Sequence, residues 1–203
     1  NTIFFLNPKA MFFWHDYPTN VPKVQKTSVS EYDIVFFARI CKDKGIEDLL
    51  EAISLAKSVL PNIKLHIIGP VSHSYKNKLT KIIDFLYLGE NVVFIGFLPT
   101  QEDVYEHAIK AKICVLPTYH DVIPGTIIES MYIRLPVIAY AVGGIPELNE
   151  EIEVIKLVKC HDIQGLAQEI INLLSNESER SRMADNAYNY AIKGFNNEVI
   201  LPQ

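Results

Sequence analysis

The chain has 203 residues, of which 49% are apolar and 21% are charged, a composition ordinary for a soluble globular protein. Its formal net charge of −5 provides no basic field for a polyanion, which argues against nucleic acid as a partner. The three cysteines lie far apart and outside any CxxC or Cys/His cluster, which argues against a disulfide framework or a zinc site and favours a reducing, cytoplasmic compartment.

The chain divides into three parts by sequence pattern. Residues 1–30 are aromatic and then rich in Pro, Ser and Thr, and we interpret them as an interdomain connector. Residues 31–195 alternate short apolar runs with segments of helical periodicity, and residues 196–203 form a tail. Strands are expected at 33–37, 62–69, 91–96, 112–117, 136–141 and 153–158. Helices are expected at 45–61, 74–89, 100–111, 125–134, 162–175 and 177–192.

The alternation itself predicts a fold class. Strands that are apolar throughout, separated by amphipathic helices, indicate a parallel sheet covered on both faces. Because crossovers between parallel strands are right-handed, we predict a doubly wound α/β domain, Rossmann-like, with about six strands. Ligands of such sheets bind at the carboxyl ends of the strands. The loops to consider are therefore residues 38–45, 69–74, 96–100, 117–126 and 141–147.

The loop after the first strand reads ARICKDKG and carries two cations. Arg39 follows the strand directly, and Lys44 stands just before the next helix. A planar guanidinium together with an ammonium suits the oxygens of a diphosphate. The alternative is ordinary solvated surface charge. The loop is not a Walker loop, which needs GxxxxGK[ST].

The stretch HDVIPGTIIE follows the fourth strand and places two acids around a Pro-Gly corner. Pro124 suits the first position of a helix, so the amides of residues 125–127 would be free to bind an anion. Glu129 lies deeper in the helix, where its carboxylate could accept hydrogen bonds from a ribose diol. Asp121 precedes the helix, on the other side of any bound phosphate. The alternative is that Asp121 is a turn residue and Glu129 a helix-surface acid.

Four further positions in the loops that follow strands are candidates for ligand contact: Gly96, His120, Gly143 and Gly144. Gly96 ends the third strand, where a glycine lets the chain turn and leaves backbone groups free for a flat base. His120 adjoins Asp121, but neighbours on an extended segment point to opposite faces, so the two are not a dyad. Gly143 and Gly144 permit either a close backbone approach to a ligand or a positive φ.

Seven motifs, in chain order, resemble those of the donor-binding half of a GT-B glycosyltransferase of the retaining family 4, the glycosyl transferases group 1. They are ARICKDKG, LHIIG, VVFIG, PTYHD, the D-x7-E spacing, RLPVIAY and GGIPE. The resemblance covers residues 32–190. This chain departs from the family pattern at Ala38, where the family has Gly, and at Asp121, where it has Glu. An aspartate reaches roughly 1.5 Å less than a glutamate, which predicts a loop shift, an altered donor preference or weak activity.

The resemblance implies transfer of a sugar from a nucleotide-diphosphate sugar, a UDP- or GDP-sugar, with retention and without a metal or other cofactor. Arg39 and Lys44 would hold the diphosphate and stabilise it as it leaves, and Asp121 would face the sugar; these three are the implied catalytic residues. The implied donor-binding residues are Gly96, His120, Pro124, Gly125, Thr126 and Glu129.

The resemblance also implies partners. The acceptor-binding amino-terminal domain of a GT-B enzyme has no counterpart in this chain, so we expect weak donor binding and no turnover alone. The acceptor would be a saccharide or a lipid-linked group in surface polysaccharide or glycolipid synthesis. Phe12, Phe13 and Trp14 would cover the domain interface or contact the inner face of the membrane peripherally.

Two other functions fit parts of the pattern. One is another GT-B enzyme, such as a sugar-nucleotide epimerase, although the Arg39/Lys44 pair and the acid spacing favour the transferase. The other is a non-catalytic nucleotide-binding module, against which no GxGxxG follows the first strand.

Overall fold

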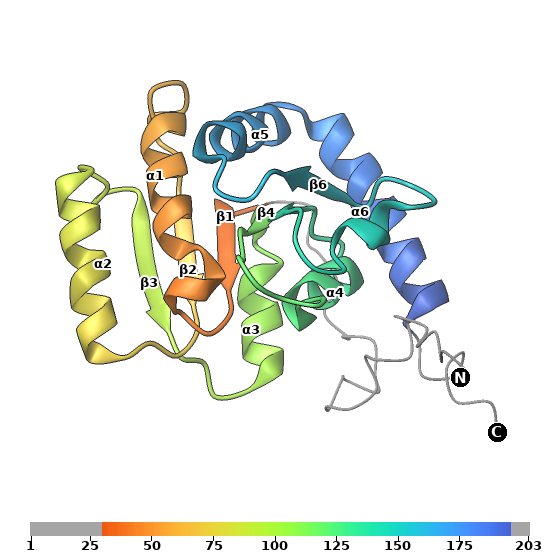
Figure 1. The fold of residues 1–203 in the computed structure, drawn as a ribbon, viewed down its shortest axis with the longest axis horizontal. Coiled ribbons are helices and arrows are strands. Elements are labelled where there is room, and N and C mark those ends of the chain that lie inside the picture. Colours follow the sequence, from red (N-terminus) through yellow and green to blue (C-terminus); the bar gives the residue numbers. More distant parts are fainter. Residues whose placement is uncertain (1–29, 196–203) are drawn as a thin grey trace, which may run out of the picture.

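The computed structural model describes residues 30–195, whose six strands form one parallel sheet in the order β3-β2-β1-β4-β5-β6 (Figure 1). The strands are β1 (Tyr32–Phe37), β2 (Leu65–Ile68), β3 (Val92–Gly96), β4 (Ala111–Leu116), β5 (Val137–Tyr140) and β6 (Ile155–Val158). The helices are α1 (Ile46–Ala56), α2 (His73–Phe85), α3 (Gln101–Ala108), α4 (Gly125–Tyr132), α5 (Ile163–Ser175) and α6 (Glu177–Gly194). Two short 3-10 helices, η2 (Lys42–Lys44) and η3 (Pro146–Asn149), complete the described elements.

The predicted fold class is confirmed, and each predicted strand and helix has its counterpart among these elements. The predicted connector lies outside the described residues except for Ser30, and so does the predicted tail. The aromatic run at residues 12–14 belongs to the part of the chain that is not described.

The burial of the strands follows their place in the sheet. The central strands β1 and β4 and their neighbour β5 are almost entirely buried, because helices cover both of their faces. The edge strand β3 is more exposed, with Val93 at 41%. This explains why the central strands read as unbroken apolar runs, since parallel strands buried on two faces have no solvent-facing side.

The helices form two layers because the crossovers on the two sides of β1 run in opposite directions. From β1 the chain moves through β2 to β3, and from β4 it moves through β5 to β6. Right-handed crossovers in opposite directions place their helices on opposite faces of the sheet. Accordingly, α1 packs against α2 and α5, while α4 packs against α6 (Figure 1).

The first helix ends earlier than its sequence pattern predicts. The pattern runs to Pro61, whereas α1 ends at Ala56. The amides of Ser58 and Val59 bond carbonyls three residues back, so the chain leaves the α-helix in tighter turns before the proline. The end of this helix lies at the amino end of the sheet, away from the strand ends where a ligand is expected.

Candidate functional site

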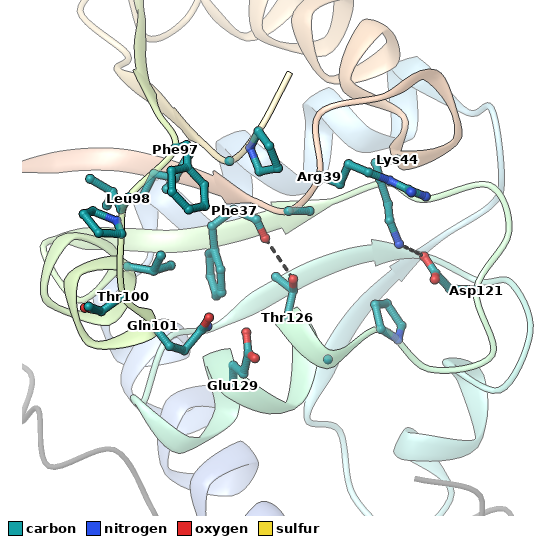
Figure 2. Close-up of a pocket in the computed structure, with 18 of the residues that line it drawn as sticks. Phe37, Arg39, Lys44, Phe97, Leu98, Thr100, Gln101, Asp121, Thr126 and Glu129 are labelled. Atoms are coloured by element: carbon teal, nitrogen blue, oxygen red, sulfur yellow. Dashed lines mark hydrogen bonds and ion pairs between the residues drawn. The ribbon is translucent and has the colours of Figure 1, made fainter. Parts of the chain in front are cut away.

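A cleft of about 540 Å³ opens at the carboxyl ends of β1 and β4, the two neighbouring strands from which the chain proceeds in opposite directions (Figure 2). Its volume is within the range of roughly 300–1,000 Å³ typical of small-molecule sites. The lining consists of residues 37–39, 44, 68–70, 97–101, 104, 121, 123–126 and 129. Seven of the nine residues singled out from the sequence line it: Arg39, Lys44, Asp121, Pro124, Gly125, Thr126 and Glu129.

The loop after β1 reaches the cleft through one glycine. Gly45 has a left-handed backbone with φ 69°, and a Cβ atom there would lie 1.8 Å from the carbonyl oxygen of Pro117. Only glycine fits this contact without displacing the backbone that follows β4. The approach brings the loop that carries Lys44 against the loop that carries Asp121.

Lys44 and Asp121 form an ion pair inside the cleft. Lys44 Nζ lies 2.6 Å from Asp121 Oδ2, and the side chains are only 17% and 20% exposed. The Thr118 hydroxyl donates a hydrogen bond to the same carboxylate oxygen. The sequence placed Asp121 before the helix and predicted no contact between it and Lys44, which the structure brings together. Limited access to water strengthens such a pair and fixes both groups.

Arg39 differs from its neighbour in having no such partner. Its side chain is exposed, and within residues 30–195 it forms neither an ion pair nor a hydrogen bond. It lies beside Lys44 at the same rim of the cleft (Figure 2). A guanidinium with its donors unused at a cleft rim can bind an anionic ligand through two parallel hydrogen bonds.

The amino end of α4 opens onto the cleft. The sequence placed Pro124 at the first helical position, but the structure makes it the N-cap, with an extended backbone and no side-chain cap for the helix. The amide of Ile127 donates to the Pro124 carbonyl, so of the three expected donors only those of Gly125 and Thr126 lack a partner among the described residues. Two unpaired amides and the helix dipole favour an anion at this point.

The side chain of Thr126 serves the fold rather than the cleft. Its hydroxyl donates to the carbonyl of Phe37 at the end of β1, over 2.8 Å. This bond fixes the start of α4 against the sheet (Figure 2). A ligand at the helix start would therefore meet the backbone amide of Thr126 and not its hydroxyl.

Glu129 faces the cleft from the second turn of α4 (Figure 2). Burial raises the pKa of its carboxyl group from 4.5 to about 7, and a hydrogen bond from the Tyr105 side chain offsets only part of that rise. The residue as a whole is half-buried, because part of it remains open to the cleft. A carboxyl group with this pKa exists in both protonation states at neutral pH.

Two of the residues singled out from the sequence do not line the cleft. His120 is exposed to solvent. Gly96 has φ 85°, and a Cβ atom added to it would meet nothing within 4 Å. The residues just after Gly96 form the wall instead, including Phe97, which is 70% exposed.

Sequence reasoning missed four residues that shape this site. Gln101 lines the cleft from the first turn of α3. Thr118 donates a hydrogen bond to Asp121, Tyr105 favours the ionised form of Glu129, and Val104 lines the wall between the loops. Gln101 could have been found by extending the loop after the third strand into the helix that follows. Nothing in the sequence marked Tyr105 as a partner of Glu129, since the two lie on different helices.

The two glycines after β5 support the acidic loop. A Cβ atom on Gly143 would lie 1.8 Å from the carbonyl oxygen of Asp121, and the Gly144 amide donates to the Val122 carbonyl over 2.6 Å. Of the two uses expected for these glycines, Gly143 has the positive φ, 55°. The close approach is to protein backbone, which holds Asp121 in place at the cleft.

No group of three or more His, Cys, Asp or Glu side chains in residues 30–195 is arranged to hold a metal ion. None of the helices described there combines the length and hydropathy that a bilayer crossing requires.

Comparison with known proteins gives a family and relatives. The model of the family described as glycosyl transferases group 1 matches residues 19–190. The capsular polysaccharide biosynthesis glycosyltransferase CapM of Staphylococcus aureus is 27% identical over 180 residues, covering 88% of this chain and 46% of that protein. The N-acetyl-alpha-D-glucosaminyl L-malate synthase of Bacillus anthracis is 25% identical over 203 residues, covering 100% of this chain and 51% of that protein. The chain thus spans about half the length of these curated relatives.

Among solved structures, the C-terminal domain of a glycosyl transferase group 1 family protein (LpcC) from Francisella tularensis has a similar fold. The TM-score is 0.73 at 24% sequence identity, with 84% of this chain and 89% of that domain covered. The similarity extends over nearly the whole of that domain, so the two chains share this fold.

Proposed function

Since the chain belongs to the glycosyl transferases group 1 family, we propose that its cleft binds the donor of a sugar transfer, a nucleotide-diphosphate sugar. The observation that carries the proposal is that Arg39, the amino end of α4 and Glu129 all face one cleft of about 540 Å³. These groups match the successive parts of such a donor, which are an anionic diphosphate and neutral diols. The proposed reaction is transfer with retention of anomeric configuration, as in family 4.

The diphosphate is proposed to lie between Arg39 and the start of α4. Arg39 has unused donors, and the amides of Gly125 and Thr126 lack partners in the described residues. Lys44 adds a second positive charge next to Arg39. As the bond between sugar and diphosphate breaks, negative charge builds on the leaving phosphate, and fixed positive groups stabilise that charge without needing to reorganise.

The sugar is proposed to lie near Asp121. Because Asp121 is bonded to both Lys44 and Thr118, its carboxylate is held in one position, from which it can accept hydrogen bonds from sugar hydroxyls or stabilise a positively charged sugar ring. The same ion pair holds Lys44 at the place where the diphosphate joins the sugar. We propose that the shorter aspartate functions here because its loop packs directly against the loop of Lys44.

The nucleoside is proposed to lie toward α3. Glu129 in its ionised form would accept hydrogen bonds from the ribose hydroxyls. The backbone that follows Gly96 would receive the base, with the exposed ring of Phe97 at the rim. We retain UDP and GDP as the candidate nucleotides, and propose that catalysis relies on positioning and charge stabilisation without a metal or other cofactor.

The acceptor site, the acceptor and the place of action are proposed as well. The curated relatives are about twice as long as this chain, so the acceptor site is proposed to lie in a second domain that faces the cleft. The acceptor would be a saccharide or a lipid-linked group in surface polysaccharide or glycolipid synthesis. We propose action in the cytoplasm, with peripheral contact at the inner face of the membrane if the acceptor is lipid-linked.

A calorimetric titration of this chain with UDP, GDP and ADP tests the proposal. Binding of one diphosphate, weakened about tenfold or more by Arg39→Ala, is the expected result. The matched control is Lys42→Ala, which removes an exposed cation of the same loop that does not line the cleft. If Arg39→Ala and Glu129→Ala both left nucleotide binding unaltered, the cleft would not be the donor site.

A second assay separates transfer from epimerisation. The full-length protein is incubated with the preferred nucleotide sugar, with and without acceptor. Sugar transfer that depends on acceptor supports the proposal. Conversion of the nucleotide sugar to its epimer in the absence of acceptor would identify a sugar-nucleotide epimerase instead.

A further inference from the structure

A buried carboxylate lies just behind the cleft. Asp48 stands in the first turn of α1 and is only 9% exposed. It accepts hydrogen bonds from the hydroxyls of Tyr119, over 2.6 Å, and Tyr140, over 2.8 Å, and His161 Nδ1 lies 3.3 Å away. The start of a helix stabilises a negative charge, which offsets part of the cost of burying this group.

The two tyrosines differ in what they connect to Asp48. Tyr140 ends the strand β5, whereas Tyr119 belongs to the segment after β4 and lies two residues before Asp121. Burial and the bond to Asp48 raise the pKa of both phenols, so both hydroxyls stay protonated and remain donors at neutral pH. The two rings lie nearly parallel, with centroids 6.2 Å apart.

The segment that carries Tyr119 is tied to the loop that carries Lys44. The amide of Tyr119 donates to the carbonyl of Asp43 over 2.8 Å, and the Thr118 hydroxyl lies 3.1 Å from the same carbonyl oxygen. The ion pair between Lys44 and Asp121 lies at the cleft end of these contacts. A displacement of Tyr119 would therefore move both charged groups.

Neither Asp48 nor Tyr119 nor Tyr140 lines the cleft. They cannot act on a ligand by contact, so any influence on it must pass through the loops. We propose that Asp48 is a positioning residue, which holds Tyr119 and thereby fixes Lys44 and Asp121 where they meet the diphosphate and the sugar. The inference rests on the proposed function and extends it to a residue outside the binding surface.

The chain offers a matched pair of variants. Tyr119→Phe and Tyr140→Phe each remove one hydroxyl from Asp48 and keep the stacked ring, so both should lower the melting temperature by a similar amount. Only Tyr119→Phe releases the segment that leads to Asp121. We expect it to weaken binding of the preferred nucleotide sugar about fivefold to tenfold, with Tyr140→Phe within about twofold of the unmodified chain.

Amide hydrogen exchange gives a second readout that does not depend on a ligand. Faster exchange at the backbone amide of residue 119 is expected in Tyr119→Phe, because its bond to Asp43 loosens with the side chain, and not in Tyr140→Phe. Equal effects of the two variants on affinity and exchange would overturn the inference. So would a Tyr119→Phe variant that binds and exchanges like the unmodified chain.

Asp48→Ala completes the test, because it removes both acceptor oxygens, and it tests the inference alone if Tyr119→Phe does not fold. The proposal expects weaker binding and faster exchange at residue 119 in Asp48→Ala, and little further loss of affinity when Tyr119→Phe is added, since both changes break one interaction. Additive losses would show that Asp48 does not act through Tyr119 and would overturn the inference. If the unmodified chain binds no nucleotide sugar, the proposed function fails, and amide exchange alone decides whether Asp48 holds the segment.

Discussion

Two regions of this domain gather charged side chains, and they do so in different ways. The first is an ion-pair quartet formed by Glu153, Lys156, Glu179 and Arg182 at β6 and α6. Each cation in it contacts both acids, at distances of 2.6–2.9 Å. The second is the cleft, where Lys44 is paired with Asp121 while Arg39 has no partner in the described residues.

The carboxyl groups of the two regions show the same contrast. Hydrogen bonds from Arg182 and Lys156 lower the pKa of Glu179 to about 2. Burial raises the pKa of Glu129 to about 7, against the hydrogen bond from Tyr105. The folded chain therefore favours the ionised form of one acid and disfavours that of the other. The quartet satisfies its charges internally, whereas the cleft keeps a cation and an acid whose missing interactions a ligand can provide.

Removing one arginine from each region should give the largest difference in nucleotide binding between the two regions. Arg39→Ala is expected to weaken nucleotide-diphosphate binding about 10- to 100-fold, because it removes a bidentate contact to phosphate. It should change the free energy of unfolding by less than about 0.5 kcal/mol, since Arg39 is exposed. Arg182→Ala should leave binding unchanged and cost about 0.5–1 kcal/mol of stability. Calorimetry and urea denaturation of both variants measure these effects; reduced binding in Arg182→Ala would remove the distinction.

Replacing one acid from each region should change stability with opposite signs. Glu129→Gln is expected to weaken binding about tenfold and to stabilise the folded chain above pH 7 by about 1–2 kcal/mol, after allowance for its partial exposure. The folded state binds more protons than the unfolded state between pH 4.5 and about 7, so this gain should vanish as the pH falls below 4.5. Urea denaturation at several pH values measures it.

The control for that change is Glu179→Gln, whose carboxyl pKa is lowered in the folded state. This variant should be less stable at pH 7, and its deficit should fade as the pH falls from 4.5 toward about 2. A Glu129→Gln variant that is destabilised at pH 8 would contradict the account of that acid.

Binding should depend on pH through Glu129. If the ionised carboxylate accepts the ribose hydroxyls, affinity should rise about threefold between pH 6.5 and 7.5, as the ionised fraction grows around a pKa of about 7. An intact nucleotide sugar should be used, because its phosphates do not titrate in this range. The dependence should be absent in Glu129→Gln; a profile that survives in that variant would assign the titration to another group.

Of these changes, Tyr105→Phe should have the smallest effect on nucleotide binding. It removes the hydrogen bond that favours the ionised form of Glu129, so the pKa of that carboxyl should rise further. Binding is expected to weaken about twofold at pH 7 and to match the unmodified chain at pH 9, where the group is ionised in both. Titrations at the two pH values measure it, and equal losses at both would indicate a packing defect instead.

The sequence predicted the fold almost completely, because apolar strands and amphipathic helices are local patterns. Seven of the nine candidate residues chosen from the sequence line one cleft, because residues that follow parallel strands lie at one edge of the sheet. It did not predict the ion pair between Lys44 and Asp121, which are separated by 77 positions and meet through the contact of Gly45 with Pro117.

The sequence did not predict the interaction partners of the site residues either. Tyr105 reaches Glu129 from another helix, and such pairings depend on how the helices pack rather than on spacing within either one. The two amides left at the start of α4 depend on whether Pro124 is the cap or the first helical residue, a shift of one position. Shifts of that size lie below the resolution of sequence patterns.

The most direct test follows the backbone amide resonances of residues 30–195 while the preferred nucleotide diphosphate is added to the chain. The account predicts that the amides of Gly125 and Thr126 move most, together with the Nε–H signal of Arg39, because these donors lie unused at the cleft. Saturable binding that shifts resonances elsewhere and leaves these three in place would contradict the claim that the diphosphate binds between Arg39 and the start of α4.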